Sequence, residues 1–150
     1  MNKKYELLVD DTITFLGWKL FRIKALISFG SVEAGELGGY VAKEGNLSHE
    51  GNAWVFGDAR VYGDARVYGN ARVYGDARVK SVKDYIVFKN NWSSGRYFTY
   101  TKSNKMWRAG CFYGTGQELI NEAYKDSENS GKHYKAYVNF VEMLEELENE

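Results

Sequence analysis

Between Val55 and Val79 the apolar and polar positions follow one six-residue cycle, written VFGDAR, VYGDAR, VYGNAR and VYGDAR. Residues two apart in an extended segment face the same side, so the Ala and the next Val of each cycle point one way and the Arg between them points the other. The Gly-Asp or Gly-Asn pair supplies a turn, because both residue types tolerate the backbone angles of a tight corner. Six residues are too few for a helix-pair repeat and do not give the seven-residue pattern of a coiled coil. The pattern therefore predicts a strand-and-turn repeat.

The pattern divides the chain into three parts. Residues 1–40 alternate loosely between apolar and polar positions and predict short strands that end at Gly38-Gly39, an N-terminal β cap. The repeat domain is expected over residues 41–80, because the cycle can be traced back to Val41 through one shared small or aliphatic position, which Ala53 and Leu47 also occupy. A short repeat leaves unpaired backbone at both ends, so we expect the flanking segments to cover them.

Residues 81–150 predict a β-meander followed by two helices. Three aromatic-rich segments, DYIVFKNN, GRYFTYT and KMWRAGCFYG, are separated by the turn-rich stretches NWSSG and KSNK. Thr115 with Glu118 forms a capping box, which predicts that the first helix opens there. A second helix is expected from about Lys132, after a flexible SENSGK stretch, with a frayed acidic end. Its apolar positions form two stripes, Tyr137, Val141 and Leu144 in one and Phe140, Met143 and Leu147 in the other.

An aliphatic residue followed four positions later by a small one recurs along the repeat, from Val55/Ala59 to Val73/Ala77. This pattern resembles that of the left-handed β-helix proteins built from hexapeptide repeats. The resemblance implies that three cycles make one triangular coil, so that residues eighteen apart stack at the spacing of adjacent strands, about 4.8 Å. Arg60 would then lie beside Arg78. The implied fold class is mainly β, a short left-handed parallel β-helix of roughly two coils with an α+β C-terminal cap.

Two further resemblances cover most of the chain. The segments LFRIKAL, GELGGYV and NLSHEGNAWV are similar to the opening of hexapeptide-repeat proteins of the YdcK-like type, many of which come from bacteriophages and prophages. The C-terminal segments WSSGRYFTYTKSN, MWRAGCFYGTGQEL and AYKDS resemble a module found in phage and Gram-positive proteins of unassigned function. Neither resemblance carries an established activity to this chain.

Composition narrows the function classes. Lys plus Arg equals Asp plus Glu at 20 each, so the basic surface of a general nucleic-acid binder is not expected. The single Cys111 excludes an intrachain disulfide and a thiolate zinc cluster. Neither a signal-peptide pattern nor an apolar run near the ~20 residues of a membrane span is present. These features predict no membrane association and a cytoplasmic location, which is the host cytoplasm if a phage encodes the chain.

Acyl transfer is one candidate activity. The resemblance implies a His that acts as general base in a cleft between subunits, and the chain offers only His49 and His133. His49 falls in the phase of an inward residue, and packing is the more common role for such a His. His133 lies at the expected helix start, a poor place for a positioned base. Two His are also too few for a carbonic anhydrase-like zinc site, so no metal site is expected.

The candidate favoured by the sequence is a non-catalytic binder of a small anionic, nucleotide-like ligand that needs no cofactor. Aromatic faces stack on bases, Arg forks bind phosphate, and free N–H groups at a helix start attract anions. The expected ligand-binding residues come from the meander and the first helix start: Trp92, Ser93, Ser94, Arg96, Tyr100, Trp107, Arg108 and Thr115. The phage resemblance suggests one version of this function, a sponge that sequesters a host immune signalling nucleotide. A purely structural assembly module is the other alternative.

The expected partner, besides the ligand, is a further copy of the chain. A two-coil repeat buries little surface, and we expect its aromatic residues to lie on outer faces, where an apolar patch marks an interface. The sequence therefore predicts a homotrimer that associates through Phe56, Tyr62, Tyr68 and Tyr74.

Overall fold

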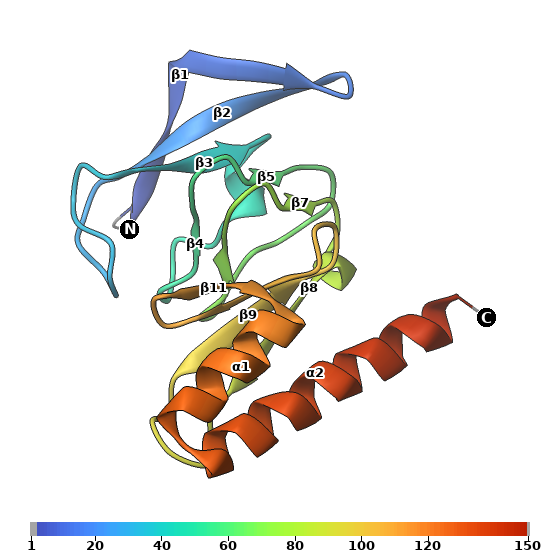
Figure 1. Ribbon diagram of the computed structural model, residues 1–150. Helices are drawn as coiled ribbons and strands as arrows, with labels where there is room; N and C mark the ends of the chain where they lie inside the picture. The colour runs from blue at the N-terminus through green and yellow to red at the C-terminus, as the bar shows by residue number, and fades with distance from the viewer. Residues whose placement is uncertain (1–2, 150) are drawn as a thin grey trace.

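A computed structural model describes residues 3–149 and arranges them in three tiers (Figure 1). A long hairpin forms the first tier, the repeat forms the second, and a sheet with two helices forms the third. The first tier holds β1 (Tyr5–Phe15), β2 (Trp18–Ala25) and β3 (Leu37–Val41). The repeat holds the short helix η1 (Glu44–Asn46), β4 (Trp54–Val55), β5 (Arg60–Val61), β6 (Arg72–Val73) and β7 (Arg78–Val79). The third tier holds η2 (Val82–Asp84), β8 (Tyr85–Lys89), β9 (Tyr97–Thr101), β10 (Met106–Ala109), β11 (Phe112–Thr115), α1 (Gly116–Asp126) and α2 (Glu128–Glu148).

The strands form three separate sheets. One is a mixed five-stranded sheet in the order β1-β2-β3-β5-β7, one is the parallel pair β4-β6, and one is the antiparallel sheet β11-β10-β9-β8. The expected fold class, a short left-handed parallel β-helix with an α+β cap, is therefore wrong. Each six-residue cycle contributes at most two ladder residues, because the Gly turn with its positive φ takes the others. The parallel ladder of β5 and β7 joins the antiparallel strands of the first tier through β3, β4 and β6 pair only with each other, and no closed parallel helix forms from the described residues.

Pairing between residues eighteen apart is confirmed within the repeat. Arg60 pairs with Arg78 in β5 and β7, and Trp54 pairs with Arg72 in β4 and β6. The rings of Phe56 and Tyr74, also eighteen apart, stack at 3.9 Å. The Ala and Val positions of the cycle point inward and are fully or almost fully buried, as the alternation predicts.

The phase traced back toward Val41 is wrong by two residues. Val41 pairs with Val61, and Leu47 bridges Val67, so both partners are twenty residues away. Two extra residues therefore lie in the turn between Leu47 and β4, and this wider corner carries His49. Small and aliphatic residues both fit the inward position, so the sequence pattern cannot detect this insertion.

The third tier departs from the predicted meander in two places. KMWRAGCFYG forms two strands, because Gly110 with φ of +59° turns the chain between β10 and β11. The capping box at Thr115 is confirmed. The second helix begins at Glu128, before the expected Lys132, because the Ser127 hydroxyl caps it by accepting the Ser130 N–H. The stretch expected to be flexible is thus the first turn of α2.

Three apolar cores stabilise the fold, and the smallest packs Phe15, Leu20 and Tyr40 of the first tier against Tyr62 of the repeat. The first core runs from Tyr5 and β2 through the repeat to Tyr85, and the second lies between the antiparallel sheet and the two helices. The predicted covers at the repeat ends are confirmed. β3 pairs with β5 at one end, and at the other end Thr99 and Ser103 accept the backbone N–H groups of Arg72 and Arg78.

The surface expected to form a trimer is mostly covered within the chain. Tyr62 is 7% exposed, packed by Phe15 and Trp18. Phe56 and Tyr74 are partly buried against each other. Of the four expected interface aromatics only Tyr68, at 59% exposure, faces outward. Within residues 3–149, neither helix combines the length and apolar character needed to cross a bilayer.

Candidate functional site

A hollow lies on the face of the repeat where Leu47 bridges Val67, and we call it the repeat groove. Its volume is about 620 Å³. Two chain segments form its floor, and two backbone hydrogen bonds of 2.9 Å join them, from Ser48 N to Val67 O and from Val67 N to Asn46 O. The groove is lined by Glu44, Gly45, Leu47, Ser48, His49, Arg66, Val67, Tyr68 and Val82.

Arg66 and Tyr68 provide the charged and the aromatic group on the groove floor. Val67 between them is fully buried, so alternation turns the side chains of Arg66 and Tyr68 outward together. Tyr85 supports both residues from below, since its hydroxyl donates to Arg66 O at 2.7 Å and its ring packs edge-on against Tyr68 at 6.5 Å. No carboxylate among the described residues lies within ion-pair distance of Arg66. The groove thus offers an unpaired guanidinium beside an exposed aromatic face.

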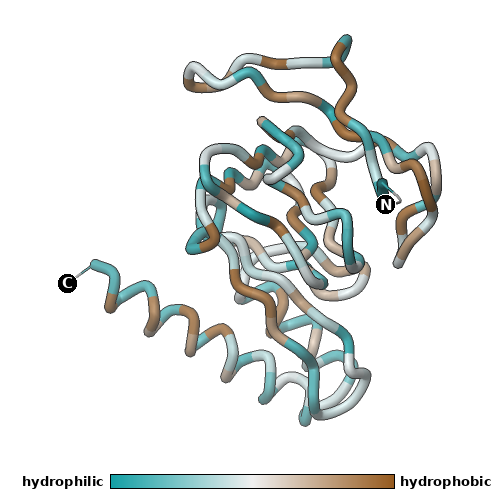
Figure 2. Tube along the Cα trace, turned by 180° about the vertical axis from the view of Figure 1, so that it is seen from behind, coloured by the Kyte–Doolittle hydropathy of each residue, from teal (hydrophilic) through white to brown (hydrophobic). Residues whose placement is uncertain are grey.

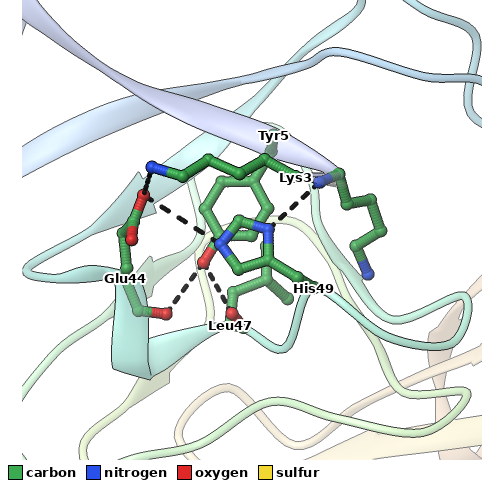
Figure 3. Close-up of polar contacts among 6 residues, drawn as sticks. Lys3, Tyr5, Glu44, Leu47 and His49 are labelled. Carbon is green, nitrogen blue, oxygen red and sulfur yellow. Dashed lines mark hydrogen bonds and ion pairs between the residues drawn. The ribbon is translucent and has the colours of Figure 1, made fainter. Parts of the chain in front are cut away.

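His49 is fixed in the wall of the groove (Figure 3). Its ring stacks on Tyr5 at 4.1 Å, and its Nδ1 atom accepts the backbone N–H of Lys4 at 3.1 Å. Because Nδ1 accepts a hydrogen bond, the proton of the neutral ring sits on Nε2. That Nε2 atom is shielded from solvent, has no hydrogen-bond partner in the described structure, and lies 4.0 Å from a Glu44 carboxylate oxygen.

Burial shifts the pKa values of the titratable side chains in and beside this wall of the groove. It lowers the pKa of His49 below its usual value, an effect that Glu44 opposes and that Lys3 and Lys4 strengthen. Lys4 is 1% exposed, its Nζ donates to Ala53 O at 2.7 Å, and burial lowers its pKa to about 8. Burial, reinforced by Glu44, raises the pKa of Tyr5 well above its usual value. His49 and Tyr5 are therefore neutral near pH 7.

The rim of the groove is held by side chains that sequence analysis did not single out. The Tyr5 hydroxyl lies 2.8 Å from Glu44 O and 2.5 Å from Leu47 O (Figure 3). Asn46 is fully buried, accepts the N–H groups of Ala42 and Lys43, and donates to Ala65 O at 2.9 Å. The Glu44 carboxylate is half-exposed and pairs with Lys3 at 3.2 Å. This pairing offsets the negative charge of the rim.

The aromatic residues expected to bind a ligand are largely buried under α2. Trp107 and Tyr100 are 2% and 3% exposed. Trp92 stacks on His133 at 4.5 Å, and its indole N–H donates to the Ser130 hydroxyl at 3.3 Å. The faces of these rings pack against the protein itself.

The polar residues of that expected site are also dispersed. Ser93 bonds to Asn90, and the Ser94 hydroxyl accepts the backbone N–H of Arg96. The Arg108 guanidinium lies 4.0 Å from the ring centre of Tyr74. Arg96 lines one hollow of about 490 Å³, while Tyr100, Trp107 and Thr115 line another of about 340 Å³. The structure does not bring the eight residues together in one hollow.

The sequence contained only a weak signal for Arg66 and Tyr68. They belong to the triplet Arg-Val-Tyr, which also occurs at residues 60–62 and 72–74. Which triplet stays uncovered depends on where the flanking tiers pack, and the repeat does not encode that. In the described part of the chain, no group of three or more His, Cys, Asp or Glu side chains is arranged to hold a metal ion.

Comparison with known protein families gives a match for the repeat, and this match does not extend over the whole chain. Residues 59–74 and 65–80 match the YdcK β-solenoid repeat. The predicted repeat is thereby confirmed as one of a β-solenoid repeat family, over a small part of the chain. No curated protein matches this sequence.

Proposed function

We propose that the protein is a non-catalytic binder of a small anionic, nucleotide-like ligand, and that the repeat groove is its site. The observation that carries the proposal is the pair on the groove floor, the unpaired Arg66 guanidinium beside the exposed ring of Tyr68. A volume of about 620 Å³ falls within the ~300–1,000 Å³ range of small-molecule pockets.

Each part of a nucleotide has a partner in the groove. The planar guanidinium of Arg66 matches phosphate oxygens, and the face of Tyr68 can stack on a base. The half-exposed Glu44 carboxylate can accept hydrogen bonds from ribose hydroxyls, as acidic residues do in dinucleotide sites. We therefore assign the phosphate to Arg66, the base to Tyr68 and the sugar to Glu44. The sponge version of this function rests on the phage resemblance alone.

The geometry of His49 favours binding over acyl transfer. A general base must present a nitrogen lone pair to the proton that it removes. In His49 the Nδ1 lone pair accepts the Lys4 N–H, and the proton sits on the shielded Nε2. His49 therefore serves as a packing element of the groove wall.

Isothermal titration calorimetry against linear and cyclic nucleotides tests the proposal. We expect at least one nucleotide to bind, and Arg66→Ala to weaken that binding by about 1.5–3 kcal/mol, the typical worth of a charge-assisted hydrogen bond. Tyr68→Ala should cost about 1–3 kcal/mol through lost stacking. The free nucleoside and inorganic phosphate, each lacking one half of the ligand, should bind more weakly than the nucleotide.

Arg60→Ala is the matched control, because Arg60 occupies the same Arg-Val-Tyr triplet with its Tyr covered. It should leave affinity unchanged, and so should Arg96→Ala in the separate hollow. The absence of heat from every nucleotide, or an equal loss in Arg60→Ala and Arg66→Ala, contradicts the proposed function. A loss of nucleotide affinity in Arg96→Ala alone would show that the binding site lies in the third tier instead.

A further inference from the structure

The outer face of α2 is largely uncovered by the described chain, with one contact at its edge, where the ring centres of Phe140 and Phe88 lie 6.4 Å apart. Phe140, Met143 and Leu147 are 47%, 62% and 63% exposed, and Ala136 is exposed one turn earlier. We call these four residues the outer stripe. Figure 2 shows brown apolar segments alternating with teal polar ones along the part of α2 that runs out beyond the other elements.

The opposite face of α2 packs against the rest of the protein. Tyr134, Val138 and Val141 are buried in the second core. On the same side, Glu145 pairs with Lys105 at 2.8 Å and Glu148 pairs with Lys102. These bonds hold the end of the helix to the β9–β10 turn, so the outer stripe is presented by an anchored helix on the side opposite the core.

The spacing of the outer stripe is that of a coiled-coil seam. Its members follow one another at intervals of four, three and four residues, the a/d pattern by which one helix packs against another. On a helix with 3.6 residues per turn such a stripe is narrow, which suits a single partner helix.

The charges beside the stripe specify the partner. Lys132, Asn139 and Glu146 are spaced by seven residues and so occupy equivalent positions along one edge of the stripe. In a parallel pair of α2 helices, this edge of each copy would lie on opposite sides of the seam, so Lys132 could not lie beside Glu146 of the other copy, and the helix dipoles would align unfavourably. In an antiparallel pair, Lys132 of each copy lies beside Glu146 of the other and Asn139 meets its equivalent at the two-fold axis.

We propose that the outer stripe of α2 is a self-association surface at which two copies of this chain pair antiparallel. The contact is self-complementary and closes at two, so the product is a dimer. The stripe is short, and small interfaces of this kind give weak, reversible association. The trimer expected from the sequence used a different surface, the repeat aromatics, and is a competing outcome of the same test.

Sedimentation velocity over a range of micromolar concentrations is the first measurement. We expect a concentration-dependent shift from 17.2 kDa toward twice that mass. Met143→Glu should raise the dimer dissociation constant about tenfold or more, as loss of a central apolar anchor does. Val9→Glu is the matched control, since Val9 is 72% exposed on β1, and it should leave the constant unchanged. Unaltered circular dichroism melting in both variants shows that folding is intact.

Cross-linking tests the antiparallel geometry. In a Cys111→Ser background, Asn139→Cys should join to its equivalent in the second copy through a short bis-maleimide, whereas Leu147→Cys should not join to its own equivalent. Efficient cross-linking at Leu147→Cys contradicts the antiparallel arrangement. A monomer mass at every concentration, a mass three times 17.2 kDa, or equal effects of Met143→Glu and Val9→Glu overturns the proposed surface.

Discussion

At the scale of single residues, His49 illustrates how a titratable side chain serves the fold. Its ring lies on Tyr5, and its one available lone pair accepts a backbone N–H from the start of β1. A protonated ring would place a second N–H against that backbone N–H, so the folded state favours the neutral form. The neutral imidazole thus adds to the contacts that hold the corner with His49 against the segment with Lys4 and Tyr5.

This arrangement makes stability depend on pH. The pKa of His49 is lowered in the folded state from the usual 6.5, with burial as the largest cause. Below about pH 6.5 the unfolded chain therefore takes up a proton that the folded chain does not, and stability falls as the pH decreases. We expect the melting temperature to drop between about pH 7 and pH 5.5, and this drop to be smaller in His49→Gln.

His133→Gln is the control for that measurement, because His133 lies on α2 away from the repeat groove, with its ring stacked on Trp92 and its Nδ1 at 2.8 Å from Asn129 O. It should retain the wild-type pH dependence. Parallel melting curves for wild type and His49→Gln across this pH window would contradict the role assigned to His49.

At the scale of elements, the first tier joins the repeat through a glycine pair in β3. A Cβ on Gly39 would stand 2.6 Å from Ala59 O and 2.7 Å from Val55 Cγ1. Both atoms are part of the buried repeat, so neither can move away cheaply. The close approach of β3 to the repeat, and with it the five-stranded sheet, therefore requires glycine at this position.

Gly39→Ala should destabilise the fold by about 1–3 kcal/mol, the usual cost of overpacking a core. Gly45→Ala is the matched control, since nothing lies closer than 3.9 Å to a Cβ there, and it should change stability by no more than about 0.5 kcal/mol. Urea unfolding of the two variants and wild type measures both effects. Equal midpoints for Gly39→Ala and Gly45→Ala would rule out the close packing of β3.

These elements also indicate which features the sequence could predict. The inward Ala and Val positions and the cap at Thr115 follow from local patterns, the eighteen-residue pairing follows from the family resemblance, and the structure confirms all three. The fold class was wrong because a repeat pattern does not reveal where antiparallel flanking strands replace parallel coils. The repeat pattern also could not predict the repeat groove, because it does not show which tyrosine stays exposed. Tyr62 and Tyr68 both lie in the sequence Ala-Arg-Val-Tyr-Gly, and tertiary packing covers one and exposes the other.

At the scale of the whole molecule, the two surfaces that we assign lie against different apolar cores. The repeat groove lies against the first core, and the outer stripe belongs to α2, whose opposite face packs in the second core. Ligand binding and self-association therefore use different tiers, and a variant that affects one is not expected to alter the other. The buried aromatics of the third tier, Trp107 among them, support that helix.

An NMR titration of ¹⁵N-labelled protein with the nucleotide that calorimetry identifies would locate the ligand on the protein. We expect the amide shifts to concentrate on the groove residues Glu44–His49 and Arg66–Tyr68, and to be lost in Arg66→Ala. Shifts concentrated instead on Arg96 and β9–β10, or no specific shifts at saturating nucleotide, would contradict the repeat groove as the binding site.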